Sequence, residues 1–209
     1  MSRNERKKVT VGLSCEGLDA SPGPTMLLID PGEAFGDGSH PSTSLALRLL
    51  EELLRGKYGP PPPVDGWVLD AGCGSGVLGL AAAALGSFKV LGVDLDSRAI
   101  EAARGNLRLN PGPGSKVSLA LGELLCARGP FCLVLANLVP SVHVRAQKTL
   151  WRAVASGGWL ILSGFFQTQK DLILLPYVRN GATEKGYSLD QAWAGIILHK
   201  PAANGPSRS

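Results

Sequence analysis

Residues Val68–Gly76, which read VLDAGCGSG, set the architecture that the rest of the chain must fit. The apolar residues that open the stretch are typical of a short buried β-strand, and glycines follow at Gly72, Gly74 and Gly76. Because glycine has no Cβ, these residues let the backbone turn tightly from a strand into a helix and leave room for a ligand against the turn. Free backbone N–H groups at the start of that helix can bind polar ligand atoms. The stretch therefore predicts a strand, a ligand-binding turn and a helix in succession.

Strands and helices keep alternating beyond this turn. Strands that alternate with helices at this pace predict a mostly parallel sheet that is covered on both faces. The fold class is therefore α/β, with a doubly wound, mostly parallel sheet of seven strands. We expect strands at 67–71, 89–94, 116–121, 132–137 and 157–163, closing strands at 183–189 and 193–199, and helices at 76–85, 97–110, 141–155 and 167–178.

The segment before the turn has a different character. Two short runs at 9–14 and 25–29 are rich in apolar and β-branched residues and predict a small N-terminal hairpin. A leucine-rich helix is expected at 43–55, with Ser42 or Thr43 as its N-cap.

The composition is that of an ordinary globular protein, with 44% hydrophobic and 18% charged residues over 209 positions. The net charge of +4 comes from the two ends, because residues 1–8 carry +3 and residues 201–209 carry +1. Residues 9–200 are neutral, with 16 basic and 16 acidic side chains. Nucleic-acid enzymes usually carry their basic residues on the folded surface, so we expect no direct nucleic-acid binding.

Targeting, membrane and metal signals are absent from the sequence. No apolar core follows the charged first residues, and the longest apolar runs are too short to cross a bilayer. The four cysteines have no C-x-x-C spacing, which favours reduced thiols over a metal site. We expect a cytoplasmic protein without a metal, in which residues 1–29 form a basic tail and short strands, 30–200 one domain, and 201–209 a disordered tail.

The spacing of the glycines indicates the cofactor. The pattern is D-x-G-x-G-x-G from Asp70, whereas dinucleotide-binding turns have G-x-G-x-x-G, and Val77 stands where the third dinucleotide glycine would be. An acid before the turn suits the ammonium of an amino acid, and Asp94 at the end of the next strand can accept both ribose hydroxyls. Together they point to S-adenosylmethionine bound by Asp70, Gly72, Gly74, Gly76 and Asp94. The alternative is a purely structural turn, with Asp94 as a helix cap.

Four segments together resemble the catalytic domain of the PrmA family, whose members methylate amino groups of a ribosomal protein. They are DPGEAFGDGSHPSTS, VLDAGCGSGVLGLAA, VLGVDLD and LVLANLV, and the resemblance runs from about residue 27 to 199. It implies a Rossmann-like class I methyltransferase fold for residues 30–200. The family's loop, D-P-G-x-A-F-G-T-G-x-H-P-T-T, is much more specific than the glycine turn, which all class I methyltransferases share.

The resemblance implies a role for five residues. In the family, the second threonine of the H-P-T-T stretch, the first motif glycine and the acid that ends the second strand contact the cofactor, and they match Thr43, Gly72 and Asp94. The asparagine that ends the fourth strand lies at the reaction edge and matches Asn137, which is expected both to bind the cofactor and to act in catalysis. The aromatic residue of A-F-G helps to close the loop over the cofactor and matches Phe35.

Physical reasoning about the side chains adds further expectations. The Asn137 carbonyl can accept a hydrogen bond from an amine and aim its lone pair at the methyl group, although asparagine also serves well as a helix cap. Leu95 is expected to pack on the adenine, with an ordinary core leucine as the alternative. His40 is expected to be a structural residue of the loop, and Glu123 a solvated acid rather than a partner of the adenine amino group.

The sequence also departs from the family. Asp37 and Ser42 stand where the family has threonines, and only about 30 residues precede the loop, too few for the family's N-terminal recognition domain. We expect either a stand-alone catalytic domain or a shortened relative, which leaves the substrate open.

The preferred prediction is an N-methyltransferase acting on a lysine ε-amine or an α-amine of a large-subunit ribosomal protein. The alternatives are a small-molecule, RNA or other protein acceptor, and a non-catalytic cofactor-binding module. Leu138 and Val139 follow the asparagine where enzymes acting on amides and base nitrogens carry N-P-P, which disfavours those acceptors.

Overall fold

The computed structural model describes residues 8–13, 25–30 and 39–202, which form one sheet of seven strands, a separate hairpin and the surrounding helices. The strands are β1 Val9–Leu13, β2 Thr25–Ile29, β3 Trp67–Ala71, β4 Lys89–Asp94, β5 Val117–Leu121, β6 Phe131–Asn137, β7 Val154–Phe166, β8 Thr183–Asp190 and β9 Trp193–His199. The helices are α1 Pro41–Leu54, α2 Val77–Gly86, α3 Ser97–Leu109, α4 Pro111–Gly114, α5 Pro140–Ala153 and α6 Lys170–Val178, with short 3₁₀ turns η1 Leu124–Cys126 and η2 Gln167–Gln169.

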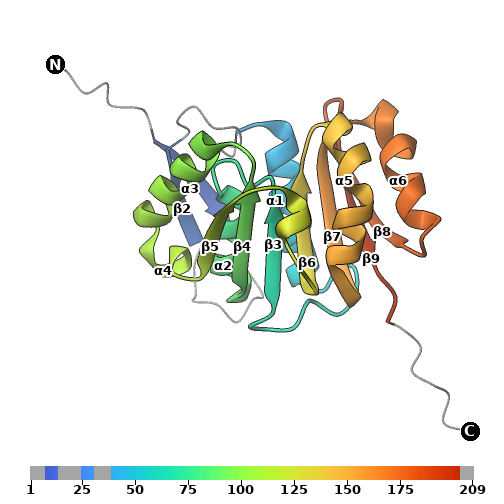
Figure 1. Cartoon of the computed structure of the whole chain (residues 1–209), viewed down its shortest axis with the longest axis horizontal. Coiled ribbons are helices and arrows are strands. Elements are labelled where there is room, and N and C mark those ends of the chain that lie inside the picture. Colours follow the sequence, from blue (N-terminus) through green and yellow to red (C-terminus); the bar gives the residue numbers. More distant parts are fainter. Residues whose placement is uncertain (1–7, 14–24, 31–38, 203–209) are drawn as a thin grey trace, which may run out of the picture.

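The large sheet has the strand order β5-β4-β3-β6-β7-β9-β8 (Figure 1). Strands β3 to β7 pair in parallel, and β9 runs antiparallel to both β7 and β8. The chain moves outward from β3 through β4 to β5 and then returns to place β6 on the other side of β3. Ligands of doubly wound sheets bind where the strand order reverses in this way, so the fold directs attention to the carboxyl ends of β3 and β6. The predicted α/β fold with seven strands is confirmed.

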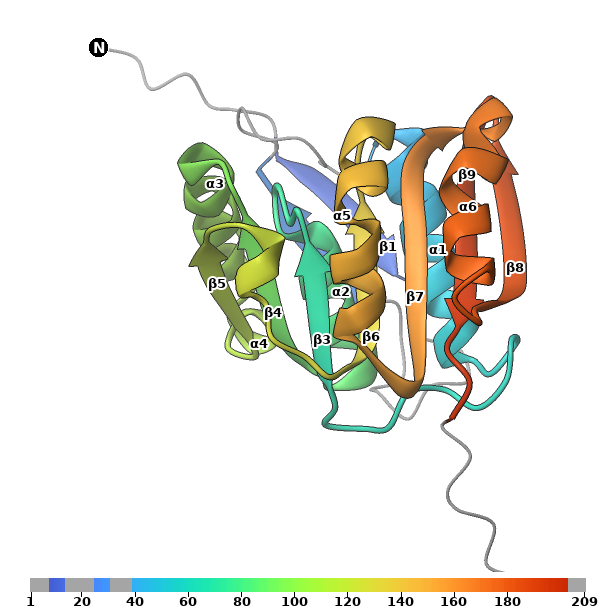
Figure 2. The same ribbon diagram turned by 45° about the vertical axis from the view of Figure 1, so that its right-hand side comes forward.

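Helices cover both faces of the sheet (Figure 2). One apolar core joins α1 and α2 to the hairpin strands and to one face of the sheet, and a second joins α5 and α6 to the opposite face. This arrangement explains why β3 and β6 are apolar almost throughout, since a strand covered on both sides has no solvent-facing row.

The predicted N-terminal hairpin is present, and two asparagines fasten it to the domain. Strands β1 and β2 pair antiparallel, with Val9 opposite Ile29. The Asn110 side chain bonds the backbone N–H and C=O of Leu28, both at 2.9 Å. The Asn106 amide accepts from the Asp30 N–H at 2.8 Å and donates to the carbonyls of Asp30 and Ser75. Asn106 therefore links the hairpin to the glycine turn.

The N-caps of α1 and α3 set where these helices begin, and the cap of α1 differs from the sequence prediction. The N-cap of α1 is His40, whose Nδ1 accepts from the Ser42 N–H at 3.2 Å, and Ser42 and Thr43 lie buried in the first turn. Pro41 is favourable at the first helical position because its missing N–H needs no partner there, and it sets the start of the helix one residue after His40. The N-cap of α3 is Asp96, which accepts from the Arg98 N–H.

Strand β7 is the element that departs most from its predicted length. It was expected at 157–163 but spans Val154–Phe166. Gly164 has a φ of +91°, and the pairing with β9 shifts register between Ser163 and Phe165 before it continues. A glycine in the left-handed region lets the strand pass through this irregularity instead of ending at Ser163.

Candidate active site

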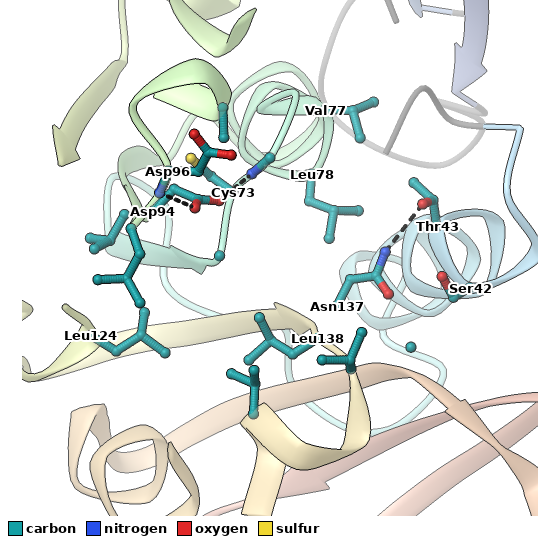
Figure 3. Close-up of a pocket in the computed structure, with 18 of the residues that line it drawn as sticks. Ser42, Thr43, Cys73, Val77, Leu78, Asp94, Asp96, Leu124, Asn137 and Leu138 are labelled. Carbon is teal, nitrogen blue, oxygen red and sulfur yellow. Dashed lines mark hydrogen bonds between the residues drawn. The ribbon is translucent and has the colours of Figure 1, made fainter. Parts of the chain in front are cut away.

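A pocket of about 540 Å³ opens at the carboxyl ends of β3, β4 and β6, where the strand order reverses (Figure 3). Its size falls in the range of small-molecule sites, about 300–1,000 Å³. The wall is mostly apolar, with few polar groups. The lining residues are His40, Ser42, Thr43, Gly72, Cys73, Gly74, Val77, Leu78, Val93, Asp94, Leu95, Asp96, Ala99, Gly122, Leu124, Asn137, Leu138, Val139, Val142, Gly164 and Trp193.

The glycine turn forms one wall of the pocket. Gly72 and Gly74 line it with φ angles of +68° and +52°, in the left-handed region that favours glycine. A Cβ on Gly72 would collide with the side chain of Leu138, on the opposite wall. Gly76 does not line the pocket, because it is buried at the N-cap of α2, where a Cβ would lie 3.2 Å from the Ala103 Cβ. The turn thus brings bare backbone to the pocket at Gly72 and Gly74, whereas Gly76 lets α2 and α3 approach each other.

Asp94 joins the turn to the end of β4. Its Oδ2 accepts from the Gly74 N–H at 2.9 Å and its Oδ1 from the Asp96 N–H at 3.0 Å (Figure 3). Each carboxylate oxygen can accept a second hydrogen bond, so this half-buried group is both anchored and still able to receive donors from the pocket. The alternative in which Asp94 only caps the next helix does not hold, because the N-cap of α3 is Asp96.

Asp70 lies elsewhere than expected. Its side chain is 2% exposed, does not line the pocket, and points to α2, where Oδ2 accepts from the Gly79 N–H at 2.9 Å. A Cβ on Gly79 would lie 3.0 Å from this oxygen, so the helix makes room for the carboxylate. Burial raises the pKa of Asp70 to about 7, and the negative charge of Asp94 adds to the rise. The sequence predicted that Asp70 contacts a ligand ammonium directly. The structure instead buries its side chain beneath the turn, where it supports α2.

Asn137 faces the glycine turn from the end of β6. Its Nδ2 donates to Thr43 Oγ1 in α1 at 3.1 Å (Figure 3), and its Oδ1 accepts from Ser163 Oγ in β7 at 3.0 Å. Thr43 and Ser163 are fully buried, whereas Asn137 is half-buried and lines the pocket. Helix α5 has Val139 as its N-cap, so Asn137 is not the cap considered as an alternative.

Aromatic and apolar side chains complete the pocket beside Asn137. Trp193 lines the wall and packs against His40 and Phe166, with ring centroids 4.6 Å and 4.4 Å away. At the opposite side, Leu95 lines the pocket while 71% exposed, which excludes the alternative of an ordinary core leucine. Val139, two residues after Asn137, also lines the pocket and is 60% exposed.

Three residues at the site, Ser163, Gly164 and Trp193, were not predicted from the sequence. Ser163 ends the apolar run WLILS and is followed by a glycine, which is the signal that could have marked a strand irregularity at the sheet edge. Phe35 and the departure at Asp37 lie outside the described residues. Glu123 is exposed at the start of η1 and does not line the pocket, as expected of a solvated acid.

The described residues contain neither a metal-binding cluster nor a membrane-spanning helix. In that part of the chain, no three His, Cys, Asp or Glu side chains are grouped to hold a metal ion. None of the helices described is both long and apolar enough to cross a bilayer. Cys73 is buried in the pocket wall, and burial raises the pKa of its thiol, which disfavours the reactive thiolate.

Comparison with known proteins places this fold among the class I methyltransferases. An RNA methyltransferase from Salinibacter ruber, solved in complex with S-adenosyl-L-homocysteine, shares the fold at 16% identity and a TM-score of 0.55, with 78% of this chain and 96% of that one covered. A ribosomal protein L11 methylase from Lactobacillus delbrueckii subsp. bulgaricus is more similar, at 28% identity and a TM-score of 0.70, covering 83% of this chain and 84% of the other.

The chain belongs to the PrmA family, described as ribosomal protein L11 methyltransferase, whose sequence profile matches residues 6–201. The ribosomal protein L11 methyltransferase of Syntrophotalea carbinolica is 36% identical over 187 residues. That alignment covers 90% of this chain and 59% of the relative, so the chain spans about three fifths of the relative's length.

Proposed function

We propose that this protein is an S-adenosylmethionine-dependent N-methyltransferase that modifies an amino group of a ribosomal protein. One observation carries the proposal: a single pocket joins the glycine turn and Asp94 to the amide of Asn137. The family's name adds the acceptor class, since the matching relatives are called ribosomal protein L11 methyltransferases.

The residues that would hold the cofactor fit its chemistry. Backbone at Gly72 and Gly74 can lie directly against a nucleoside or amino-acid moiety, and the Asp94 carboxylate offers acceptors for two ribose hydroxyls. Leu95 offers an apolar surface for adenine at the open side of the pocket. When bound, the cofactor supplies a methyl group already activated by a sulfonium centre, so the protein's task is to position and desolvate the acceptor.

Asn137 is the residue proposed to act on the acceptor. Its Oδ1 accepts one hydrogen bond from Ser163 and can accept a second from an incoming amine N–H. That contact would turn the nitrogen lone pair toward the methyl carbon. With the cofactor bound, methyl transfer to this nitrogen would form the C–N bond while the electron pair of the broken C–S bond stayed on the cofactor's sulfur.

An amine must lose a proton before it can attack. The carboxylates that line the pocket, Asp94 and Asp96, belong to the β4 side, and Asp94 is already bonded to backbone N–H groups. His40 uses Nδ1 to cap α1. The wall beside Asn137 includes Leu138, Val139 and Trp193 and is thus largely apolar, which lowers the pKa of an entering amine. We therefore propose that the amine enters neutral, having released its proton to water.

A protein acceptor fits the opening better than a small metabolite. Val139 and Leu95, which line the pocket, are 60% and 71% exposed, and Phe166, whose ring packs against Trp193, is 42% exposed. Exposed apolar side chains around a site are typical of macromolecular contact surfaces. A cytoplasmic location, with neither membrane nor direct nucleic-acid binding, accompanies this proposal.

Methyl transfer from labelled S-adenosylmethionine is the direct test. The purified chain would be incubated with ribosomal protein L11, with total ribosomal RNA and with a metabolite extract in parallel. Label on lysine ε-amines or the α-amine of the protein is the expected result. Label in RNA or metabolites alone would contradict the acceptor, and cofactor binding by calorimetry without transfer to any fraction would favour a non-catalytic binding module.

A further inference from the structure

The orientation of the Asn137 amide depends on β7. Ser163 is the register partner of Asn137 in the parallel pair β6·β7, and its hydroxyl lies 3.0 Å from Asn137 Oδ1. Thr43 occupies the other side of the amide, 3.1 Å from Nδ2. An asparagine amide can exchange its oxygen and nitrogen by a rotation of the side chain, and in the observed orientation Oδ1 accepts from Ser163 while Nδ2 donates to Thr43.

Ser163 itself is rigidly held. Its backbone carbonyl accepts from the Leu138 N–H at 3.1 Å and lies 2.8 Å from His143 Nε2. Burial lowers the pKa of His143 to about 4, so the ring is neutral, and the adjacent carbonyl requires the proton to sit on Nε2. With its carbonyl fixed by two donors and its side chain fully buried, Ser163 has its hydroxyl in a set position.

Gly164 leaves the space that this arrangement needs. A Cβ at Gly164 would lie 2.9 Å from Asn137 Oδ1 and would also collide with the Leu138 carbonyl. The left-handed φ of +91° at the same residue carries β7 past the site. The pair Ser163–Gly164 therefore supplies a donor and a gap at the same point of the pocket wall.

We infer that Ser163 is a positioning residue, whose hydroxyl fixes the Asn137 amide with Oδ1 toward β7 and one lone pair free for the acceptor amine. The inference rests on the proposed function for its kinetic consequence, although the amide orientation itself does not. Without the hydroxyl, Oδ1 loses its buried donor and the amide can rotate. Only a fraction of the bound complexes would then have Oδ1 placed to accept a hydrogen bond from the acceptor amine. Misplacement of this kind lowers the catalytic rate and leaves cofactor affinity intact.

The kinetic experiment compares the full chain with Ser163→Ala. We expect kcat for methyl transfer to fall about tenfold, with the Kd for S-adenosylmethionine changed less than twofold. The matched pair Ser163→Thr and Ser163→Val has nearly the same shape and differs in the hydroxyl, so Thr should retain more activity than Val. Ser118→Ala, at an exposed strand position in β5, controls for a general effect of losing a strand serine.

A second background shows whether the hydroxyl acts through Asn137. In Asn137→Ala protein, removal of the Ser163 hydroxyl should have little further effect, because the group that it orients is already gone. An equal tenfold loss in both backgrounds would overturn the inference, and so would an unchanged kcat for Ser163→Ala.

A readout independent of activity separates this inference from the proposed function. The side-chain NH₂ signals of Asn137 can be assigned by their absence in Asn137→Asp protein. In Ser163→Ala and Ser163→Val they should shift and broaden, and in Ser163→Thr they should resemble the wild type. Unchanged signals in Ser163→Ala would contradict the inference even if the wild-type chain methylates its acceptor, whereas altered signals in a wild-type chain that transfers no methyl group would contradict only the proposed function.

Discussion

The two halves of the pocket are built in different ways. The half proposed for the cofactor is local, because the Gly74 N–H bonds an acid only 20 residues later and both belong to one strand–turn–helix–strand unit. The half proposed for the acceptor is assembled from α1, β6 and β7. Asn137 is bonded there to Ser163, 26 residues away, and to Thr43, 94 residues away, which is also an expected cofactor contact. The first relies on backbone groups, and the second on side chains whose orientation other side chains decide.

The two halves are therefore vulnerable to different changes. Backbone N–H groups in the turn are fixed by φ and ψ, so the cofactor half fails mainly when Asp94 or its glycines change. The acceptor half fails by losing alignment, which lowers a rate without abolishing binding. Four sets of substitutions test this division of the pocket.

The largest effect is expected from Asp94→Ala. The change removes the acceptors for two ribose hydroxyls together with the anchors of the Gly74 and Asp96 N–H groups. Hydrogen bonds to a charged group are each worth about 1.5–3 kcal/mol, so the Kd for S-adenosylmethionine should rise on the order of 1,000-fold. Calorimetric titration measures this, with Asp171→Ala, an exposed acid of α6, as the control. Undiminished binding would remove Asp94 from the cofactor half.

Asp70→Asn tests the buried support of the same half. The pKa of Asp70 is raised to about 7 by burial, above its value of about 4 in the unfolded chain. A raised pKa in the folded state means that the contribution of Asp70 to stability is complete at low pH and is lost as pH rises toward 7. The free energy of unfolding of the wild type should therefore fall, relative to Asp70→Asn, by roughly 3 kcal/mol between pH 4 and pH 7. Urea unfolding across that range measures it, and parallel pH curves for the two proteins would show that Asp70 is not protonated in the fold.

Asn137→Ala should affect the rate and spare the binding. We expect kcat to fall about 100-fold with the Kd for S-adenosylmethionine changed less than twofold, because the amide belongs to the acceptor half. Single-turnover methyl transfer and calorimetry provide the two values. A large loss of cofactor affinity would mean that the two halves are not separable at this residue.

The smallest difference is expected between two glycine substitutions. Gly72→Ala would strain a residue at φ +68° and push its new methyl group into Leu138, whereas Gly157→Ala strains a residue at φ +76° with no atom within 4 Å of the new Cβ. Both should lose about 1–2 kcal/mol of unfolding free energy through strain, and Gly72→Ala about 1–2 kcal/mol more through the collision. Equal losses in urea unfolding would show that Leu138 moves aside without cost.

The sequence predicted the sheet well because its signals are local. Strands Thr25–Ile29, Lys89–Asp94 and Trp193–His199 have their expected bounds, since apolar runs between turn residues fix them. The position of Asp70 could not be read in the same way, because residue type suggests a ligand contact while the pleat of β3 and the gap at Gly79 direct the side chain to α2. Ser163 escaped notice for a related reason: its role depends on the pairing of β6 with β7, which no local pattern encodes.

Asn106 makes the hairpin and the pocket thermodynamically dependent on each other. One side-chain amide donates to the Ser75 carbonyl in the glycine turn and to the Asp30 carbonyl at the end of β2, while it accepts from the Asp30 N–H. A shift of the hairpin must therefore be felt at the turn, and linkage makes the effect reciprocal. A ligand that binds the observed turn more tightly when the hairpin is docked must stabilise the docked hairpin by the same coupling free energy. Slower hydrogen exchange of the Asp30 amide on binding would report that coupling.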